Sequence, residues 1–144
     1  IQSDPNKEET KDKSKPEINT GRILLAEDNE LNQEIAVTIL EEAGFSMEVA
    51  GNGRIALDML QKSEPGYYQL VLMDVQMPEM DGYEATRQIR RLENTQLSRI
   101  PILAMTANAF EEDKQEALEA GMNGYIAKPI NIKELFAALK EVLG

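Results

Sequence analysis

Leu70-Val71-Leu72-Met73-Asp74 decides the expected fold, because four consecutive apolar residues are followed directly by an acid. Ile23-Leu24-Leu25-Ala26-Glu27-Asp28 shows the same pattern closer to the N-terminus. An apolar run of this kind is typical of a strand buried on both faces, as in a parallel sheet that helices cover on each side. The two runs therefore predict the centre of such a sheet.

The remaining pattern alternates between strand and helix periods. Strands are expected at residues 22–26, 46–50, 69–74, 100–106 and 124–127, and helices at about residues 31–43, 54–62, 82–93, 110–120 and 132–143. Gly44 is expected to end the first helix, and the second strand contains Glu48, which suits a sheet edge. The last helix carries an apolar stripe that we expect to face the core: Ile132, Leu135, Phe136, Leu139, Val142 and Leu143. Five successive βα units predict a single doubly wound α/β domain with a five-stranded parallel sheet and five helices.

The domain is expected at residues 21–144, after a charged segment at residues 1–20. Ile1 and Ile18 are the only large apolar residues of that segment, so it cannot bury enough apolar surface to offset ordering. We therefore interpret residues 1–20 as a flexible linker. The first residue is not methionine, which favours a fragment or a processed product.

Composition excludes several kinds of chemistry. The 144 residues include 26 acids, 15 bases and no cysteine, histidine or tryptophan. Thiolate nucleophiles, imidazole bases and histidine-bound metals are therefore excluded. The net charge of −11 argues against direct nucleic-acid binding, which needs clustered basic residues. The longest apolar run, residues 100–105, is too short to insert into a membrane.

Polar residues follow four of the expected strands: Glu27 and Asp28, Asp74, Thr106, and Lys128. Each has an ordinary explanation alone, such as loop surface, helix capping or a partly exposed lysine. The carboxyl ends of parallel strands meet at one edge of the sheet, so the five side chains are expected together. Carboxylates, a hydroxyl and an ammonium suit phosphoryl transfer to Asp74, with Mg²⁺ (or Mn²⁺) held by the three acids and the phosphoryl oxygens bound by Lys128 and Thr106.

The sequence resembles the receiver domain of two-component response regulators over about residues 20–144. The resemblance rests on five segments: Ile23-Leu24-Leu25-Ala26-Glu27-Asp28-Asn29, Leu72-Met73-Asp74-Val75-Gln76-Met77-Pro78, Met80-Asp81-Gly82, Ala104-Met105-Thr106-Ala107 and Tyr125-Ile126-Ala127-Lys128-Pro129. It implies a flavodoxin-like sheet with strand order 2-1-3-4-5. It also implies a cis peptide bond between Lys128 and Pro129.

The resemblance further implies roles for individual residues. Asp74 would be the phosphoacceptor, and the backbone carbonyl of Gln76 would be a metal ligand beside the three acids. Thr106 and Tyr125 would form the switch pair, in which the hydroxyl moves toward the phosphoryl group and the ring turns inward. Gln76 and Asn108 would tune dephosphorylation. Such a domain catalyses its own aspartyl phosphorylation and dephosphorylation.

Two segments most resemble the sequences of the C-terminal receivers of hybrid sensor histidine kinases. They are Glu27-Asp28-Asn29-Glu30-Leu31-Asn32 and Asp81-Gly82-Tyr83-Glu84-Ala85-Thr86. This implies a cytoplasmic domain, within a parent that could be membrane-anchored, whose partner is a histidine kinase or histidine phosphotransfer domain. A homodimer through the fourth helix, fifth strand and fifth helix is a further expectation.

Three other kinds of protein could share parts of this pattern. A flavodoxin-like nucleotide binder would need phosphate-binding donors where the acidic stretch Glu27-Asp28-Asn29-Glu30 stands. A hydrolase with an aspartyl-phosphate intermediate would need a substrate cap, for which the chain has no room. A receiver-like interaction module that is never phosphorylated stays open as the alternative.

Overall fold

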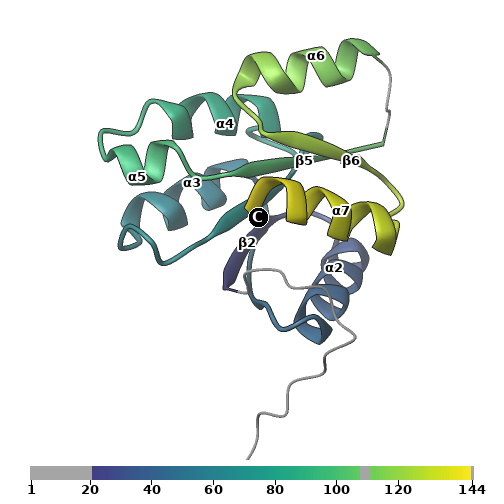
Figure 1. The fold of residues 1–144 in the computed structure, drawn as a ribbon. Coiled ribbons are helices and arrows are strands. Elements are labelled where there is room, and N and C mark those ends of the chain that lie inside the picture. Colours follow the sequence, from purple (N-terminus) through teal and green to yellow (C-terminus); the bar gives the residue numbers. More distant parts are fainter. Residues whose placement is uncertain (1–20, 108–110, 144) are drawn as a thin grey trace, which may run out of the picture.

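The computed structural model describes residues 21–107 and 111–143, so the predicted linker at residues 1–20 lies outside the described residues. In chain order the elements are β2 (Arg22–Ala26), α2 (Glu30–Glu42), β3 (Ser46–Ala50), α3 (Gly53–Lys62), β4 (Leu70–Asp74), α4 (Gly82–Arg90), α5 (Thr95–Ser98), β5 (Ile102–Thr106), α6 (Glu111–Ala120), β6 (Gly124–Ala127) and α7 (Ile132–Leu143) (Figure 1). The five strands are parallel in the order β3-β2-β4-β5-β6, which confirms the predicted order 2-1-3-4-5 and the predicted edge position of β3.

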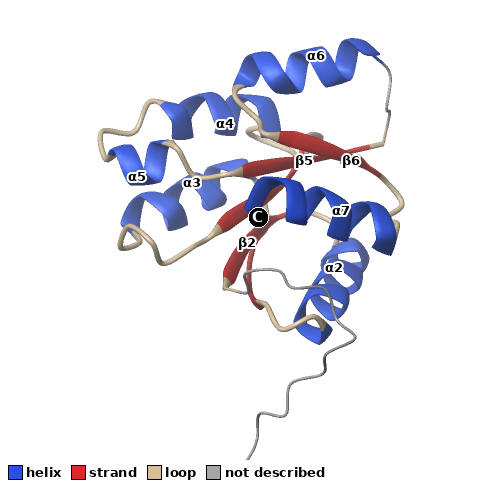
Figure 2. Cartoon of the chain, in the orientation of Figure 1, coloured by secondary structure: helices blue, strands red, loops and turns tan. Residues whose placement is uncertain are grey.

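Each face of the sheet has its own apolar core, because successive side chains of a strand point to opposite faces. Leu24 and Val71 lie on the face covered by α3, α4, α5 and α6. Leu25 and Leu72 lie on the face covered by α2 and α7. Figure 2 shows the strands between these two layers of helices. The central strands β2 and β4 are buried on both sides, as their apolar sequences predict.

Side-chain caps fix where several helices begin. The side chains of Asn29, Asn52, Asp81 and Asn94 accept hydrogen bonds from backbone N–H groups in the first turns of α2, α3, α4 and α5. At the other end of α2, Gly44 has a φ of 105°, a conformation that favours glycine. The glycine predicted to end this helix therefore does so.

Within residues 21–107 and 111–143 the structure has six helices rather than the expected five. The helix expected at residues 82–93 ends at Arg90, and Asn94 caps the separate four-residue helix α5. Four residues are too few to show a helical period in the sequence. Strands β4 and β5 also begin later than predicted, at Leu70 and Ile102.

The predicted stripe of the last helix is also corrected. Ile132 is 55% exposed at the start of α7, whereas Leu135 and Leu139 are fully buried. In α2 the buried residues are Ala36 and Leu40, while the apolar side chains of the first turns point to solvent. The burial thus follows the packing of each helix on the sheet rather than its most apolar stripe.

Arg90 ties the end of α4 to three other segments. Its guanidinium donates hydrogen bonds to the carbonyl oxygens of Ser98 (2.8 Å), Ile100 (2.7 Å) and Gly121 (2.7 and 2.9 Å) and to the side-chain oxygen of Asn123 (2.9 Å). Burial lowers the pKa of this guanidinium. Arg90 thereby connects α5, the approach to β5 and the loop between α6 and β6.

A polar cluster stands at the amino ends of the strands. Glu48 accepts hydrogen bonds from the hydroxyls of Tyr67 (2.6 Å) and Tyr68 (2.7 Å), and its carboxylate lies 3.5 Å from the guanidinium of Arg22. The Arg22 guanidinium also stacks 4.0 Å from the centre of the Tyr67 ring. These contacts explain why an edge strand carries a half-buried glutamate.

No helix among the described residues is both long and apolar enough to cross a membrane.

Candidate functional site

The sheet brings the predicted polar residues to its carboxyl edge. Glu27 and Asp28 follow β2, Asp74 ends β4, Thr106 ends β5, and Lys128 follows β6. The register aligns these ends, since Asp74 pairs with Met105, directly before Thr106. The five residues therefore meet because the strands are parallel and end at the same level.

Asp74 is buried, with 1% of its surface exposed, yet both of its carboxylate oxygens have partners. Oδ1 accepts a hydrogen bond from the backbone N–H of Gln76 at 3.2 Å, and Oδ2 accepts one from the Lys128 ammonium at 3.0 Å. A buried carboxylate without such partners would be strongly disfavoured. The arrangement presents an anionic oxygen pair at the bottom of the site.

Glu27 is as deeply buried as Asp74, and α2 holds it in place. Its Oε2 accepts hydrogen bonds from the backbone N–H of Asn29 (3.1 Å) and the side-chain amide of Asn32 (3.4 Å). The Gln33 amide donates to the backbone carbonyl of Glu27 at 2.7 Å. Burial, with the nearby charge of Asp74, raises the pKa of the Glu27 carboxyl despite these hydrogen bonds and Lys128.

Asp28 completes a group of three acids. It is exposed, and carboxylate oxygens of Glu27, Asp28 and Asp74 lie within 4.8 Å of one another. Hard divalent cations such as Mg²⁺ prefer oxygen ligands of this kind and retain several waters. The donor set fits such a cation, with two buried acids below and one acid open to solvent.

Lys128 lies between the two buried acids. Its ammonium is 3.0 Å from Asp74 Oδ2 and 3.5 Å from Glu27 Oε1. Burial opposes its charge, but the hydrogen bonds and charges of the two acids outweigh burial and raise the pKa of Lys128. The peptide bond to Pro129 is cis, as the resemblance predicts.

Thr106 and Tyr125 lie on the neighbouring strands β5 and β6. Thr106 is 6% exposed, and its backbone carbonyl accepts a hydrogen bond from the N–H of Lys128 at 2.8 Å. Tyr125 is 36% exposed, and the ammonium of Lys114 lies 5.1 Å from the centre of its ring. The ring thus lies outward, against α6.

Gln76 and Asn108 are the two residues expected to tune dephosphorylation. The Gln76 side chain is exposed beside the acids. Asn108 lies outside the described residues. Gln76 also lines an open groove of about 530 Å³, together with Asp28, Met77, Asp81 and Tyr83.

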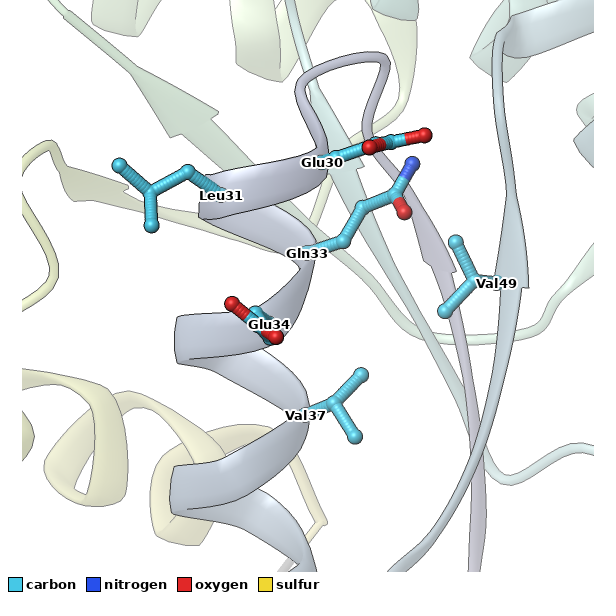
Figure 3. A pocket seen from close by; sticks show the side chains of 6 residues that line it. All are labelled: Glu30, Leu31, Gln33, Glu34, Val37 and Val49. Atoms are coloured by element: carbon cyan, nitrogen blue, oxygen red, sulfur yellow. The ribbon is translucent and has the colours of Figure 1, made fainter.

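A second hollow lies between α2 and β3 (Figure 3). Val37 of α2 and Val49 of β3 face one another across it, and Glu30 and Glu34 lie at its rim. Gln33, which also lines this hollow, bonds the Glu27 carbonyl.

Sequence reasoning missed the residues that support the acids. Asn32 and Gln33 were not singled out, because their contacts with Glu27 depend on where α2 begins. The cap signal of Asn29 could have fixed that start. Gly82 was also missed: a Cβ there would collide with the backbone oxygen of Asp74 and lie 2.9 Å from Val75 Cα. Only glycine lets the start of α4 approach β4 so closely.

Comparisons with known proteins agree with this fold. The family model described as the response regulator receiver domain matches residues 23–140. Probable histidine kinase 1 of Oryza sativa subsp. indica is 38% identical over 92% of this chain, and hybrid signal transduction histidine kinase I of Dictyostelium discoideum is 42% identical over 82%. The chain spans only 16% and 7% of the lengths of these two relatives.

Solved structures give the same result. The receiver domain of sensor histidine kinase PA1611 from Pseudomonas aeruginosa PAO1, which has magnesium coordinated in its active site cleft, matches with a TM-score of 0.76 and 39% identity, covering 88% of this chain and 99% of that one. The co-crystal structure of the Saccharomyces cerevisiae phosphotransfer protein Ypd1 with the receiver domain of Ssk1 matches with a TM-score of 0.77 and 30% identity, covering 89% and 92%. With its family match, its parallel sheet and its acidic edge, this chain belongs to the response regulator receiver domain family.

Proposed function

We propose that this domain accepts a phosphoryl group from a phosphohistidine of a partner protein onto Asp74, in a reaction that requires Mg²⁺ (or Mn²⁺). The observation that carries the proposal is the set of contacts around Asp74. Its buried carboxylate lies 3.0 Å from the Lys128 ammonium and within a group of three acids that fits a divalent cation. The chain has no histidine, so the donor belongs to another protein or another part of a longer one.

The transfer step follows from the groups present. An oxygen of Asp74 bonds to phosphorus while the phosphorus–nitrogen bond of the donor breaks. The electron pair of that bond stays with the imidazole nitrogen, which takes up a proton. The ammonium of Lys128 and the hydroxyl of Thr106 bind phosphoryl oxygens, and the attacking group is a carboxylate oxygen that needs no separate general base.

The acids Glu27, Asp28 and Asp74, with the backbone carbonyl of Gln76, would hold the cation. When bound, the cation supplies positive charge that screens the acids from the incoming phosphoryl group. Without that charge, a dianion would approach three carboxylates and a single ammonium. The proposed metal requirement therefore follows from the charge of the site.

Phosphorylation would then switch the domain or pass the group onward. Thr106 would move toward the phosphoryl group and Tyr125 would turn inward, and Gln76 and Asn108 would set the phosphoryl lifetime. The outer face of α6, β6 and α7 would carry the response, including a homodimer. No direct contact with nucleic acid is proposed.

We propose a histidine kinase or histidine phosphotransfer domain as the partner. Support comes from the kinase relatives and from the receiver solved with a phosphotransfer protein. The apolar side chains of Leu31 and Ile35 are exposed at the start of α2, where a donor reaching Asp74 would meet them. In this proposal the domain is the cytoplasmic receiver of a hybrid kinase.

The test is phosphorylation of the isolated chain by acetyl phosphate with Mg²⁺, measured by intact mass. We expect one phosphoryl adduct that hydroxylamine removes and that EDTA prevents. Asp74→Asn should abolish the adduct, and Asp58→Asn, which removes an exposed acid of α3, should leave it unchanged.

An adduct that survives in Asp74→Asn would refute the assignment of the acceptor. No adduct in the unaltered chain, with either acetyl phosphate or a phosphorylated phosphotransfer domain, would favour the interaction module that is never phosphorylated.

A further inference from the structure

The Tyr125 ring has one charged neighbour whose role the proposed function leaves open. Lys114 on α6 places its ammonium 5.1 Å from the centre of the ring. An ammonium within about 6 Å of a tyrosine ring face is attracted by the π-electrons. The contact joins α6 to β6, next to the strand that ends at Thr106.

Lys114 is the single basic residue of α6, which otherwise carries five acids between Glu111 and Ala120. The next turn of the helix offers it no carboxylate, because positions 117 and 118 are alanine and leucine. Glu116, an acid of the same helix, lies instead 3.9 Å from Arg87 of α4. Among the described side chains, the Tyr125 ring is thus the neighbour that the Lys114 ammonium contacts.

We propose that Lys114 is a positioning residue that holds Tyr125 outward in the unphosphorylated domain. The inference rests on the proposed function, because it concerns the equilibrium between outward and inward ring positions. A ring that turns inward leaves the ammonium, so the contact stabilises only the outward state. Whatever favours the outward state opposes phosphorylation by the same amount, since coupling between two sites is reciprocal.

Two contacts connect Thr106 to Asp74. The backbone of Thr106 bonds the N–H of Lys128, and Lys128 contacts the Asp74 carboxylate. Tyr125 pairs with Ala104, two residues before Thr106 on β5, so an inward movement of the ring would take place beside the Thr106–Lys128 connection and away from Lys114. The Lys114–Tyr125 contact therefore lies where this movement would break it.

The test is the affinity of the whole chain for beryllofluoride, a phosphoryl mimic, in Mg²⁺, together with the NMR signals of the Tyr125 ring. Lys114→Met removes the charge and keeps a long side chain suited to a helix. We expect beryllofluoride to bind about two- to fivefold more tightly, the range of an exposed cation–π contact. The ring signals of the free variant should move toward their positions in the bound wild type.

Two further variants separate the contact from general effects of charge. Lys114→Arg keeps the cation and should bind like the wild type. Lys62→Met removes an equal charge from an exposed position of α3. This variant should bind beryllofluoride equally or more weakly, because a lost cation disfavours an anionic ligand. The sign of the expected change in Lys114→Met is therefore opposite to that of a net-charge effect.

Unchanged or weaker binding in Lys114→Met, with unmoved ring signals, would overturn the inference. If the wild type binds no beryllofluoride, the proposed function fails instead. In that case the ring signals of the free Lys114→Met protein still decide whether Lys114 positions Tyr125.

Discussion

Glu27 is held in a position that is unfavourable for an isolated carboxylate. It is 1% exposed and lies beside Asp74, and its pKa is raised mainly by burial. A raised carboxyl pKa means that the folded state binds the proton more tightly than the unfolded state does. Tighter proton binding by the folded state stabilises it. This stabilisation is fully present below the ordinary pKa of glutamate and is lost as the pH rises through the raised pKa of Glu27. Metal-free Glu27 thus costs stability at neutral pH.

Glu27→Gln is expected to stabilise the metal-free protein by about 0.5–2 kcal/mol at pH 7, as other substitutions that relieve a strained functional site do. The gain should shrink toward pH 4, where wild-type Glu27 is increasingly protonated. Urea unfolding in EDTA at both pH values measures it. Glu41→Gln, which alters an exposed acid of α2, is the control. A destabilised Glu27→Gln protein at pH 7 would contradict the argument.

At the same scale, Asp28 separates cation binding from the buried network. Because it is exposed, Asp28→Asn should leave the metal-free stability within about 0.5 kcal/mol. It should weaken Mg²⁺ binding, so that the stabilisation of about 1.4 kcal/mol expected for the wild type at ten times its dissociation constant falls. Melting curves with MgCl₂ and with NaCl of equal ionic strength test this. Equal stabilisation by both salts would argue against a specific site.

At the scale of elements, the start of α4 and the end of β4 depend on a missing side chain. A Cβ at Gly82 would collide with Asp74 and Val75, and Gly82 N–H also donates to the Val75 carbonyl at 3.1 Å. α4 and β4 are therefore positioned by direct backbone contact. Asp81 caps the same helix one residue earlier.

Gly82→Ala should destabilise the domain by about 1–3 kcal/mol, the usual effect of overpacking. It should also slow the reaction with acetyl phosphate, because the Asp74 backbone must shift. Gly51→Ala is the matched control, since an added Cβ there meets only Ile55 Cδ1 at 4.0 Å. Similar stability and reaction rate for the two variants would show that the close approach has no consequence.

Arg90 acts over a longer range, because its five hydrogen bonds connect α4 with α5, with Ile100 before β5 and with the loop between α6 and β6. Arg90→Met would leave several buried carbonyl oxygens without a donor, so we expect a loss of about 2–4 kcal/mol. Urea unfolding measures this loss. Arg91→Met removes the adjacent, exposed guanidinium and should change stability by less than about 0.5 kcal/mol. Equal losses in both variants would contradict the role given to Arg90.

At the scale of the whole molecule, the sequence predicted whatever depends on short patterns. The apolar run before Asp74 identified a central strand, and the parallel arrangement then placed Glu27, Thr106 and Lys128 beside it. Contacts that depend on tertiary packing were not predictable. Arg90 caps carbonyls up to 31 residues away, and α5 is too short for a period. Ile132 fits a helical stripe, yet the neighbours of α7 leave it exposed.

The cluster around Glu48 has a spectroscopic consequence. Without tryptophan, the intrinsic fluorescence of the chain comes from four tyrosines. Tyr67 and Tyr68 are bound to Glu48 at the amino ends of the strands, whereas Tyr83 and Tyr125 lie toward the carboxyl edge. Replacing Tyr67 and Tyr68 by phenylalanine would leave emission only from the half of the domain that contains Asp74. The domain would then carry its own optical reporter of events at that site.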